Sequence, residues 1–191
     1  MKEGKEDGVD WKWTNCLTLT MSNDEKHSVD IPAHEVHSKS VNGLHGNNFY
    51  GSFTIVSKKG EIYNHGKSIN ASPTLAQHTE PQYFEWLDEQ LDDVPLGKIA
   101  GAQAFVIEIN QTNTPCSKAT CRKKILSCVK DGKVVDRDFP MVIARMSAYQ
   151  IYETQYPKVC PTSFEIEEGR KEQLKTFPLA SMCLHRWPEK E

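Results

Sequence analysis

The pattern of apolar positions along the middle of the chain predicts an α/β fold. Residues 48–64 show a strand-turn-strand pattern in which residues 58–60 supply the turn of a β-hairpin. Residues 102–109 form a short apolar run that is typical of a strand buried on both faces, and residues 141–146 form another. Because helices are predicted between these strands, the strands are expected to pair in parallel, as in α/β proteins.

Two helices are predicted between the strands. The first is expected to take Thr79 as its N-cap, because Thr79 and Gln82 together make the pattern of a capping box. Its apolar side chains recur at helical spacing and form one face: Tyr83, Phe84, Trp86, Leu87 and Leu91. This helix is expected to end before Pro95. The second helix is predicted over residues 117–129.

Length and composition are those of a soluble domain with extensions. The chain has 191 residues, of which 38% are hydrophobic and 26% are charged. No apolar run has the length of a membrane span, and the charged amino terminus lacks the apolar stretch of a signal peptide. We therefore expect a core at residues 46–156, an amino-terminal extension of unassigned role at residues 1–45, and a carboxy-terminal extension at residues 157–191 that packs on the core.

Charge is distributed unevenly along the chain. The formal net charge of −3 gives no overall attraction to nucleic acid. Residues 78–93, however, carry six acids and no Lys or Arg, whereas residues 118–137 carry seven bases against two acids. Each run fits a solvated helix face, and the basic run also fits a surface that binds phosphate. The sequence leaves both interpretations open.

The cysteines and one histidine offer the ligand types of a metal site. Six cysteines at uneven spacing do not indicate a disulfide scaffold, but Cys116, Cys121 and Cys128 lie close together. Upstream, His78 and Glu80 stand at the predicted start of the first helix. One imidazole and two thiolates can hold a zinc ion that keeps a fourth position open for water, and a free carboxylate beside it can move protons.

Two motifs, separated by a predicted buried strand, carry a family resemblance. They are His78-Thr79-Glu80 and, downstream, Pro115-Cys116 with Cys121. In this order they resemble the zinc-dependent cytidine deaminase superfamily, and they look most like the deaminase domains at the carboxyl ends of bacterial polymorphic toxins. The resemblance covers about residues 49–152. It implies a three-layer α/β/α fold with a mixed sheet of about five strands flanked by helices.

The resemblance also implies an activity and a role for each motif residue. The activity is hydrolytic conversion of cytosine to uracil in nucleic acid with one Zn²⁺ ion. The ion would be held by His78, Cys116 and Cys121, and Glu80 would carry a proton from the activated water to the ring nitrogen. The backbone N–H of Thr79 would face the base.

Three further residues are candidates for substrate contact. Pro115 belongs to the second motif, and Asn64 lies at the end of the hairpin, where amides in the family often bind the sugar. Tyr149 follows the last predicted strand, where aromatic side chains of nucleic-acid deaminases stack on a flanking base. Tyr149 equally fits packing against a following helix.

The spacing of the two cysteines departs from the family pattern. Four residues separate Cys116 from Cys121, whereas the family motif has two. On an unbroken helix the two thiols would lie about 140° apart, so both reach one metal only if Ser117 and Lys118 are loop. Cys128 could replace one of them, but it lies about 10 Å further along the helix, and we assign it to the core.

Other functions stay open at this point. The same zinc chemistry serves deamination of adenine, guanine or a free nucleoside. A non-catalytic module stapled by zinc would need a fourth protein ligand, which Cys128 could supply. The resemblance implies a DNA substrate, single- or double-stranded, with RNA as a further candidate and no membrane partner. A toxin domain would act in the cytoplasm of a target cell and would have an inhibitory immunity protein as partner.

Overall fold

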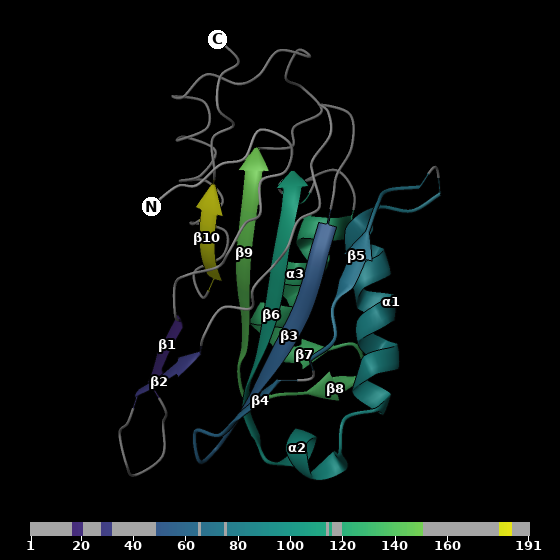
Figure 1. Cartoon of the computed structure of the whole chain (residues 1–191). Coiled ribbons are helices and arrows are strands. Elements are labelled where there is room, and N and C mark those ends of the chain that lie inside the picture. Colours follow the sequence, from purple (N-terminus) through teal and green to yellow (C-terminus); the bar gives the residue numbers. More distant parts are fainter. Residues whose placement is uncertain are drawn as a thin grey trace.

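A mixed β-sheet forms the centre of the protein (Figure 1). The computed structural model describes residues 17–20, 28–31, 49–64, 66–74, 76–113, 115, 120–150 and 180–184. The strand order is β10-β9-β6-β3-β4, and β5 pairs with the same edge of β3 as β4. The strands are β3 Phe49–Ser57, β4 Ile62–Asn64, β5 Ile69–Ala71, β6 Ala102–Asn113, β9 Val142–Gln150 and β10 Ala180–Leu184.

The strand directions confirm the α/β class. β6, β9 and β10 run parallel, whereas β3 is antiparallel to β6, β4 and β5. A helix, α3 (Thr120–Asp131), connects the parallel strands β6 and β9, because a parallel pair cannot be joined by a tight turn. The mixed sheet of about five strands with flanking helices is therefore as predicted.

The described elements form layers on both faces of the sheet. Helix α1 (Thr79–Asp92) and α3 cover one face, and their buried side chains share a single core cluster with that face. On the other face, strands β1 (Leu17–Thr20) and β2 (Ser28–Ile31) form an antiparallel hairpin that packs through Leu19 and Ile31. This arrangement is consistent with the three-layer fold.

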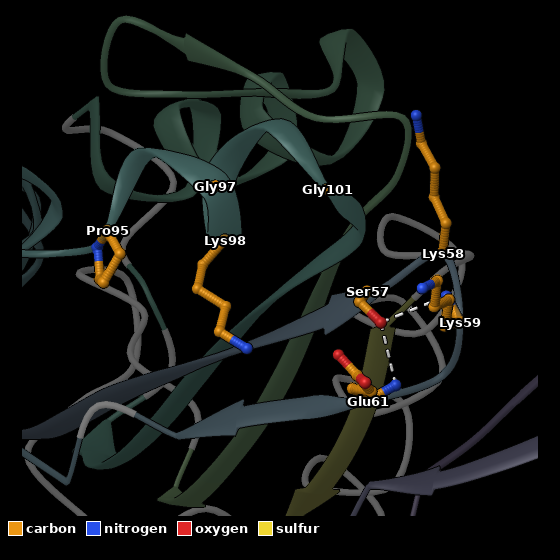
Figure 2. Close-up of a pocket in the computed structure, with 8 residues that line it drawn as sticks. All are labelled: Ser57, Lys58, Lys59, Glu61, Pro95, Gly97, Lys98 and Gly101. Atoms are coloured by element: carbon orange, nitrogen blue, oxygen red, sulfur yellow. Dashed lines mark hydrogen bonds between the residues drawn. The ribbon is translucent and has the colours of Figure 1, made fainter.

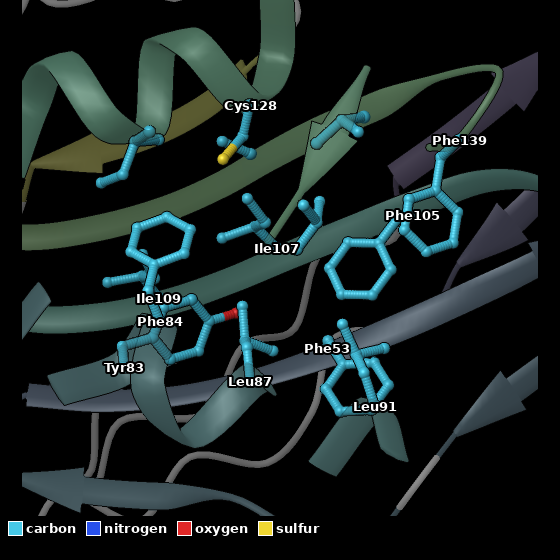
Figure 3. Packing of buried hydrophobic residues seen from close by; sticks show 14 of the residues in the cluster. Phe53, Tyr83, Phe84, Leu87, Leu91, Phe105, Ile107, Ile109, Cys128 and Phe139 are labelled. Atoms are coloured by element: carbon cyan, nitrogen blue, oxygen red, sulfur yellow. The ribbon is translucent and has the colours of Figure 1, made fainter. Parts of the chain in front are cut away.

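Alternation along β3 and β6 fills both layers. On β6, Phe105 and Ile107 point toward the helices, and Val106 between them points toward the β1–β2 hairpin. Figure 3 shows this helix-side core, in which Phe84 and Leu87 of α1 meet the sheet. Burial on both faces explains the continuous apolar run that predicted this strand.

The predicted β-hairpin is confirmed, and its turn is fixed by hydrogen bonds (Figure 2). The Ser57 hydroxyl oxygen accepts hydrogen bonds from the backbone N–H groups of Lys59 and Glu61. The Lys58 N–H donates to the Gly101 carbonyl at 3.0 Å, which joins the turn to the end of the short helix α2 (Leu96–Ala100). A second small hairpin, β7 (Lys133–Val134) with β8 (Arg137–Asp138), follows α3.

A buried ion pair joins β6 to β9. The register places Glu108 opposite Arg145, and the guanidinium donates to the carboxylate at 3.0 Å. Hydroxyl groups of Ser52 and Thr54 on β3 donate to the other carboxylate oxygen. Arg145 also donates to the carbonyl of Ile31 at 2.7 Å. Burying an unpaired charge is costly, so Arg145 and Glu108 are expected to stay paired. The hydrogen bond from Arg145 to Ile31 then holds the β1–β2 hairpin against the sheet.

Several predicted boundaries were wrong. Strand β6 continues to Asn113, four residues beyond the apolar run at residues 102–109 that predicted it. Strand β3 pairs with β6 as far as Gln111 and β9 pairs with it as far as Asn113, and this pairing supplies the backbone hydrogen bonds that make the extension favourable. Strand β9 likewise continues to Gln150. The domain boundaries at residues 46 and 156 stay a prediction, although β1, β2 and β10 lie beyond them and contact the central sheet or its core.

Glycine at position 51 allows α1 to pack on β3. A Cβ atom at Gly51 would lie 2.4 Å from Cδ2 of Tyr83, whose ring is fully buried and whose hydroxyl donates to the Ser52 carbonyl. We expect Gly51→Ala to lower the free energy of unfolding by about 1–3 kcal/mol, the typical cost of overpacking. Urea unfolding monitored by circular dichroism measures this change.

Gly97 provides the matched control. A Cβ atom at this position in α2 meets no atom within 4 Å, so Gly97→Ala should leave stability unchanged or raise it by up to about 1 kcal/mol. Equal stability of the Gly51→Ala and Gly97→Ala proteins would contradict the packing of Tyr83 described above.

Candidate metal centre

The first motif lies at the start of α1, one residue away from the predicted arrangement. The N-cap is His78, with an extended backbone (φ −71°, ψ 170°), and no side chain caps the helix. The predicted N-cap at Thr79 and the capping box with Gln82 are therefore wrong. The Thr79 hydroxyl is buried and donates to a Glu80 carboxylate oxygen at 3.2 Å, so it is not directed at the backbone of the first turn.

Hydrogen bonds before the helix hold His78 in place. The side-chain amide of Gln82 donates to the carbonyls of Ser72 at 2.9 Å and of His78 at 3.2 Å. Thr74 and Gln77 form a local turn in which the Gln77 N–H donates to the Thr74 hydroxyl at 3.0 Å. The Gln82 side chain is thus hydrogen-bonded to the backbone of the segment before α1, and it holds the residue that carries the imidazole in position.

The structure brings three ligand-type side chains together. Nδ1 of His78 lies 3.4 Å from Sγ of Cys121, and a carboxylate oxygen of Glu80 completes a group whose ligand atoms all lie within 4.8 Å of one another. Two such donors on a tetrahedral zinc ion, with bonds of about 2.05 and 2.3 Å, stand about 3.6 Å apart. The observed separation therefore fits two ligands of one metal ion without rearrangement.

Glu80 is positioned as a buried carboxylate beside this pair. Its side chain is only 3% exposed, whereas His78 is exposed to solvent. The Thr79 hydroxyl binds one carboxylate oxygen and limits how the group can rotate. A carboxylate next to a metal-binding site can have one of two roles. It can be a ligand of the ion, or it can exchange protons with a water molecule that the ion binds.

The three ligand-type residues lie near the amino termini of two helices, α1 and α3. α1 begins at the end of the sheet where β6 and β9 finish, as Figure 1 shows, and Cys121 is the second residue of α3 as described. Helix amino termini carry partial positive charge and free N–H groups, so they favour anionic groups such as thiolates and carboxylates. Pro115, between β6 and α3, is buried at this end.

The remaining predicted site residues are placed only in part. Cys116, with residues 117–119, lies outside the described residues, so its role as a ligand and the conformation of Ser117 and Lys118 on which that role depends stay untested. Tyr149 belongs to β9, not to a segment after it, and its side chain is also outside the described part. Asn64 is exposed at the end of β4, and its side-chain oxygen accepts a hydrogen bond from the Gly66 N–H at 2.8 Å. Its contact with a sugar stays a prediction.

Cys128 belongs to the core. It is 6% exposed and packs in the cluster between α3 and the sheet, as Figure 3 shows. Desolvation by this burial raises the pKa of the Cys128 thiol from 9.0 to about 11. Because zinc binds thiolate, a thiol with a raised pKa gives up its proton to a metal ion less readily than an ordinary cysteine and is a poorer ligand. This assignment agrees with the expectation from helix spacing.

The raised pKa of Cys128 predicts a loss of stability in alkali. Between pH 9 and 11 the unfolded chain releases the thiol proton while the folded chain keeps it, so the free energy of unfolding should fall as pH rises through this window. The total contribution is at most about 2–3 kcal/mol. Urea unfolding at several pH values should show a steeper decline for wild type than for Cys128→Ala, and parallel declines would contradict the prediction.

A hollow at the opposite end of the sheet is separate from this group. It has a volume of about 430 Å³ and is lined by the β3–β4 turn and by α2, as Figure 2 shows. Its lining includes Lys58, Lys59 and Lys98, but none of the three ligand-type residues. It lies near the first residue of β6, at the end of the sheet away from the start of α1.

Sequence reasoning missed two contacts that shape the centre. These are the Thr79 hydroxyl on Glu80 and the Gln82 amide on the segment before α1. The sequence shows that these positions are polar, but the hydrogen-bond partner of each side chain depends on the folded backbone.

Comparison with known proteins adds no family assignment. No protein-family model matches the chain, and a search of curated proteins finds no match. The interpretation of the centre therefore depends on its geometry and on the chemistry of its residues.

Proposed function

We propose that this protein is a zinc-dependent hydrolytic deaminase that converts cytosine to uracil in nucleic acid, with DNA as the favoured substrate. The observation that carries the proposal is the convergence of His78, Glu80 and Cys121 at the amino ends of two helices. His78 and Cys121 are 43 positions apart in the chain. They belong to two motifs that occur in the order of the deaminase signature.

The donor set favours zinc among common metal ions. Imidazole and thiolate ligands select zinc or other thiophilic metals, whereas Mg²⁺ and Ca²⁺ prefer oxygen donors. His78 and Cys121 would hold the ion, and we assign the third position to Cys116. When bound, zinc supplies a Lewis acid that activates water near neutral pH.

Glu80 is the proposed proton carrier. Its carboxylate would accept a proton from the water that attacks the amine-bearing ring carbon and donate it to the ring nitrogen of cytosine. It would then pass the second proton of that water to the exocyclic amine, which leaves as ammonia as the C–N bond breaks. Burial beside the ligand pair and the hydrogen bond from Thr79 support this role, because they hold one carboxylate oxygen and leave the other for proton transfer.

Charge beside the centre supports a nucleic-acid substrate over a free nucleoside. The described part of α3 contains Arg122, Lys123 and Lys124 directly after Cys121. Phosphate groups account for much of the affinity of proteins for nucleic acid, whereas a free nucleoside carries none.

We further propose that the protein is a toxin domain that acts inside a target cell and has an inhibitory partner protein. Among the described helices, none is long and apolar enough to cross a bilayer.

A substrate panel tests the proposal. Protein loaded with one zinc ion would be incubated with single- and double-stranded DNA, RNA and free nucleosides, and the bases would be analysed by mass spectrometry. We expect uracil in at least one polynucleotide. Inosine or xanthine alone would assign the centre to adenine or guanine instead, and uridine formation from free cytidine alone would remove the nucleic-acid claim.

The non-catalytic zinc module has weaker support. A structural site needs four protein ligands, and the residue available for the fourth position was Cys128. The Cys128 side chain is in the core, so within the described residues only Glu80 lies close enough to be the fourth protein ligand. The metal-binding measurements proposed in the Discussion separate Glu80 as ligand from Glu80 as proton carrier.

A further inference from the structure

The two helices that meet at the candidate metal centre carry opposite charge on their outer faces. Helix α1 exposes carboxylates, and its residues include no Lys or Arg. These carboxylates are Glu85, Asp88, Glu89 and Asp92, followed by Asp93 at the C-cap. Helix α3 exposes Lys123, Lys124 and Lys130, and the single acid among its residues is Asp131 at its end. A polyanion that reaches the centre therefore meets repulsion on one side and attraction on the other.

The negative face of α1 is only partly neutralised. Arg137 forms ion pairs with Asp88 and Asp92, and Lys67 pairs with Asp93. Glu85 accepts a hydrogen bond from the uncharged amide of Gln77, so it keeps its charge close to the start of the helix. The carboxylates nearest the centre thus continue to repel phosphate.

On α3, two lysines are best placed to meet phosphate. The Lys124 ammonium lies over the Phe84 ring, 4.7 Å from its centroid, and so is held against α1. Lys123 and Lys130 are exposed, and no carboxylate in the described part of the protein pairs with either. They lie seven residues apart, which is about two helical turns and about 10 Å along one face. Such a pair can contact two phosphates of one strand.

We propose that the phosphodiester backbone of the substrate lies along α3, where Lys123 and Lys130 bind it, and that the acidic face of α1 keeps the strand from crossing that helix. This inference rests on the proposed function, since it concerns the same centre. It adds the surface that binds the substrate and the side from which the strand approaches.

The test measures binding, not conversion, and uses the intact chain loaded with zinc. Affinity for a fluorescently labelled DNA strand without cytosine would be followed by anisotropy from 0.05 to about 0.3 M salt, a range in which phosphate contacts dominate the response. For Lys123→Gln/Lys130→Gln, each lost contact should lower the log–log salt slope by about 0.7–0.9. At about 0.1 M salt this corresponds to a loss of affinity of roughly 25- to 60-fold.

The turn at the far end of the sheet supplies the matched control. Lys58→Gln/Lys59→Gln removes the same charge from exposed positions that Figure 2 shows beside the hollow, roughly 35 Å from the centre along β6. This distance exceeds the screening length of about 10 Å at 0.1 M salt. The control should bind within about twofold of wild type, with an unchanged slope.

The outcomes separate this inference from the proposed function. Equal affinity and slope for the α3 variant and wild type would overturn the inference even if cytosine is converted. An equal loss in both double variants would also overturn it, because it would indicate attraction by net charge alone. Loss confined to the α3 variant in a protein that converts no base would support the binding surface and reject the deaminase.

Discussion

Replacing Cys121 by alanine is expected to abolish tight zinc binding. Sγ of Cys121 is 3.4 Å from Nδ1 of His78, a separation that suits two ligands of one tetrahedral ion. Loss of an outer-shell partner alone weakens metal binding by roughly 10- to 100-fold, so loss of this direct ligand should cost more than about 100-fold. Titration against a chelator of known affinity, with metal content measured by mass spectrometry, would give the change.

Cys128→Ala is the matched control for this substitution. It removes the same thiol from the same helix, but from a side chain that packs in the core and stays protonated at neutral pH. Its zinc content and affinity should equal those of wild type. Equal zinc affinity in the Cys121→Ala and Cys128→Ala proteins would remove Cys121 from the ligand set.

Glu80→Gln is expected to lower the rate of cytosine conversion by about 10²- to 10⁴-fold while zinc stays bound, the usual contribution of a general acid–base. Glutamine keeps the shape of the side chain and an oxygen that can accept the Thr79 hydrogen bond, so the geometry of the centre should survive. It cannot take up the proton of the attacking water. Single-turnover uracil formation, measured beside metal content, separates these two effects.

Glu85→Gln supplies the comparison on the same helix. Glu85 is exposed, accepts a hydrogen bond from Gln77 and does not belong to the ligand group, so the single-turnover rate of this variant at saturating DNA, where repulsion of the strand no longer limits binding, should stay within about twofold of wild type. Wild-type activity in Glu80→Gln would remove the proton-carrier role. Loss of zinc together with activity would instead make Glu80 a metal ligand.

Periodicity predicted much of the fold because the described core follows it closely. The apolar side chains of α1 were predicted from helical spacing, and Tyr83, Phe84, Leu87 and Leu91 are buried. The continuous apolar run of β6 predicted burial on both faces, which the two core clusters confirm. The resemblance implied that His78 and Cys121 belong to one centre, and the two residues do meet. They meet because α1 and α3 begin at the same end of the sheet.

Features set by long-range pairing were not predictable in the same way. β1 and β10 are short strands in polar or interrupted segments. β10 pairs with the distant strand β9, and the β1–β2 hairpin is held to the sheet through residues far away in the chain. The Glu108–Arg145 pair left a trace in the sequence, since each is the single charged residue of an apolar run, but only the strand register shows that they meet. Similarly, the position of the first helical residue decided whether the Thr79 hydroxyl caps the helix or binds Glu80.

The central claim is that this chain builds a catalytic zinc centre with two thiolates, one imidazole and one open position, and zinc K-edge X-ray absorption tests it most directly. We predict two sulfur scatterers at about 2.3 Å and two nitrogen or oxygen scatterers at about 2.0–2.1 Å. The spectrum should be unchanged in Cys128→Ala and in Glu80→Gln, because neither side chain is assigned to the metal. Three sulfur scatterers in wild type, or a first shell that changes in Glu80→Gln, would contradict the account.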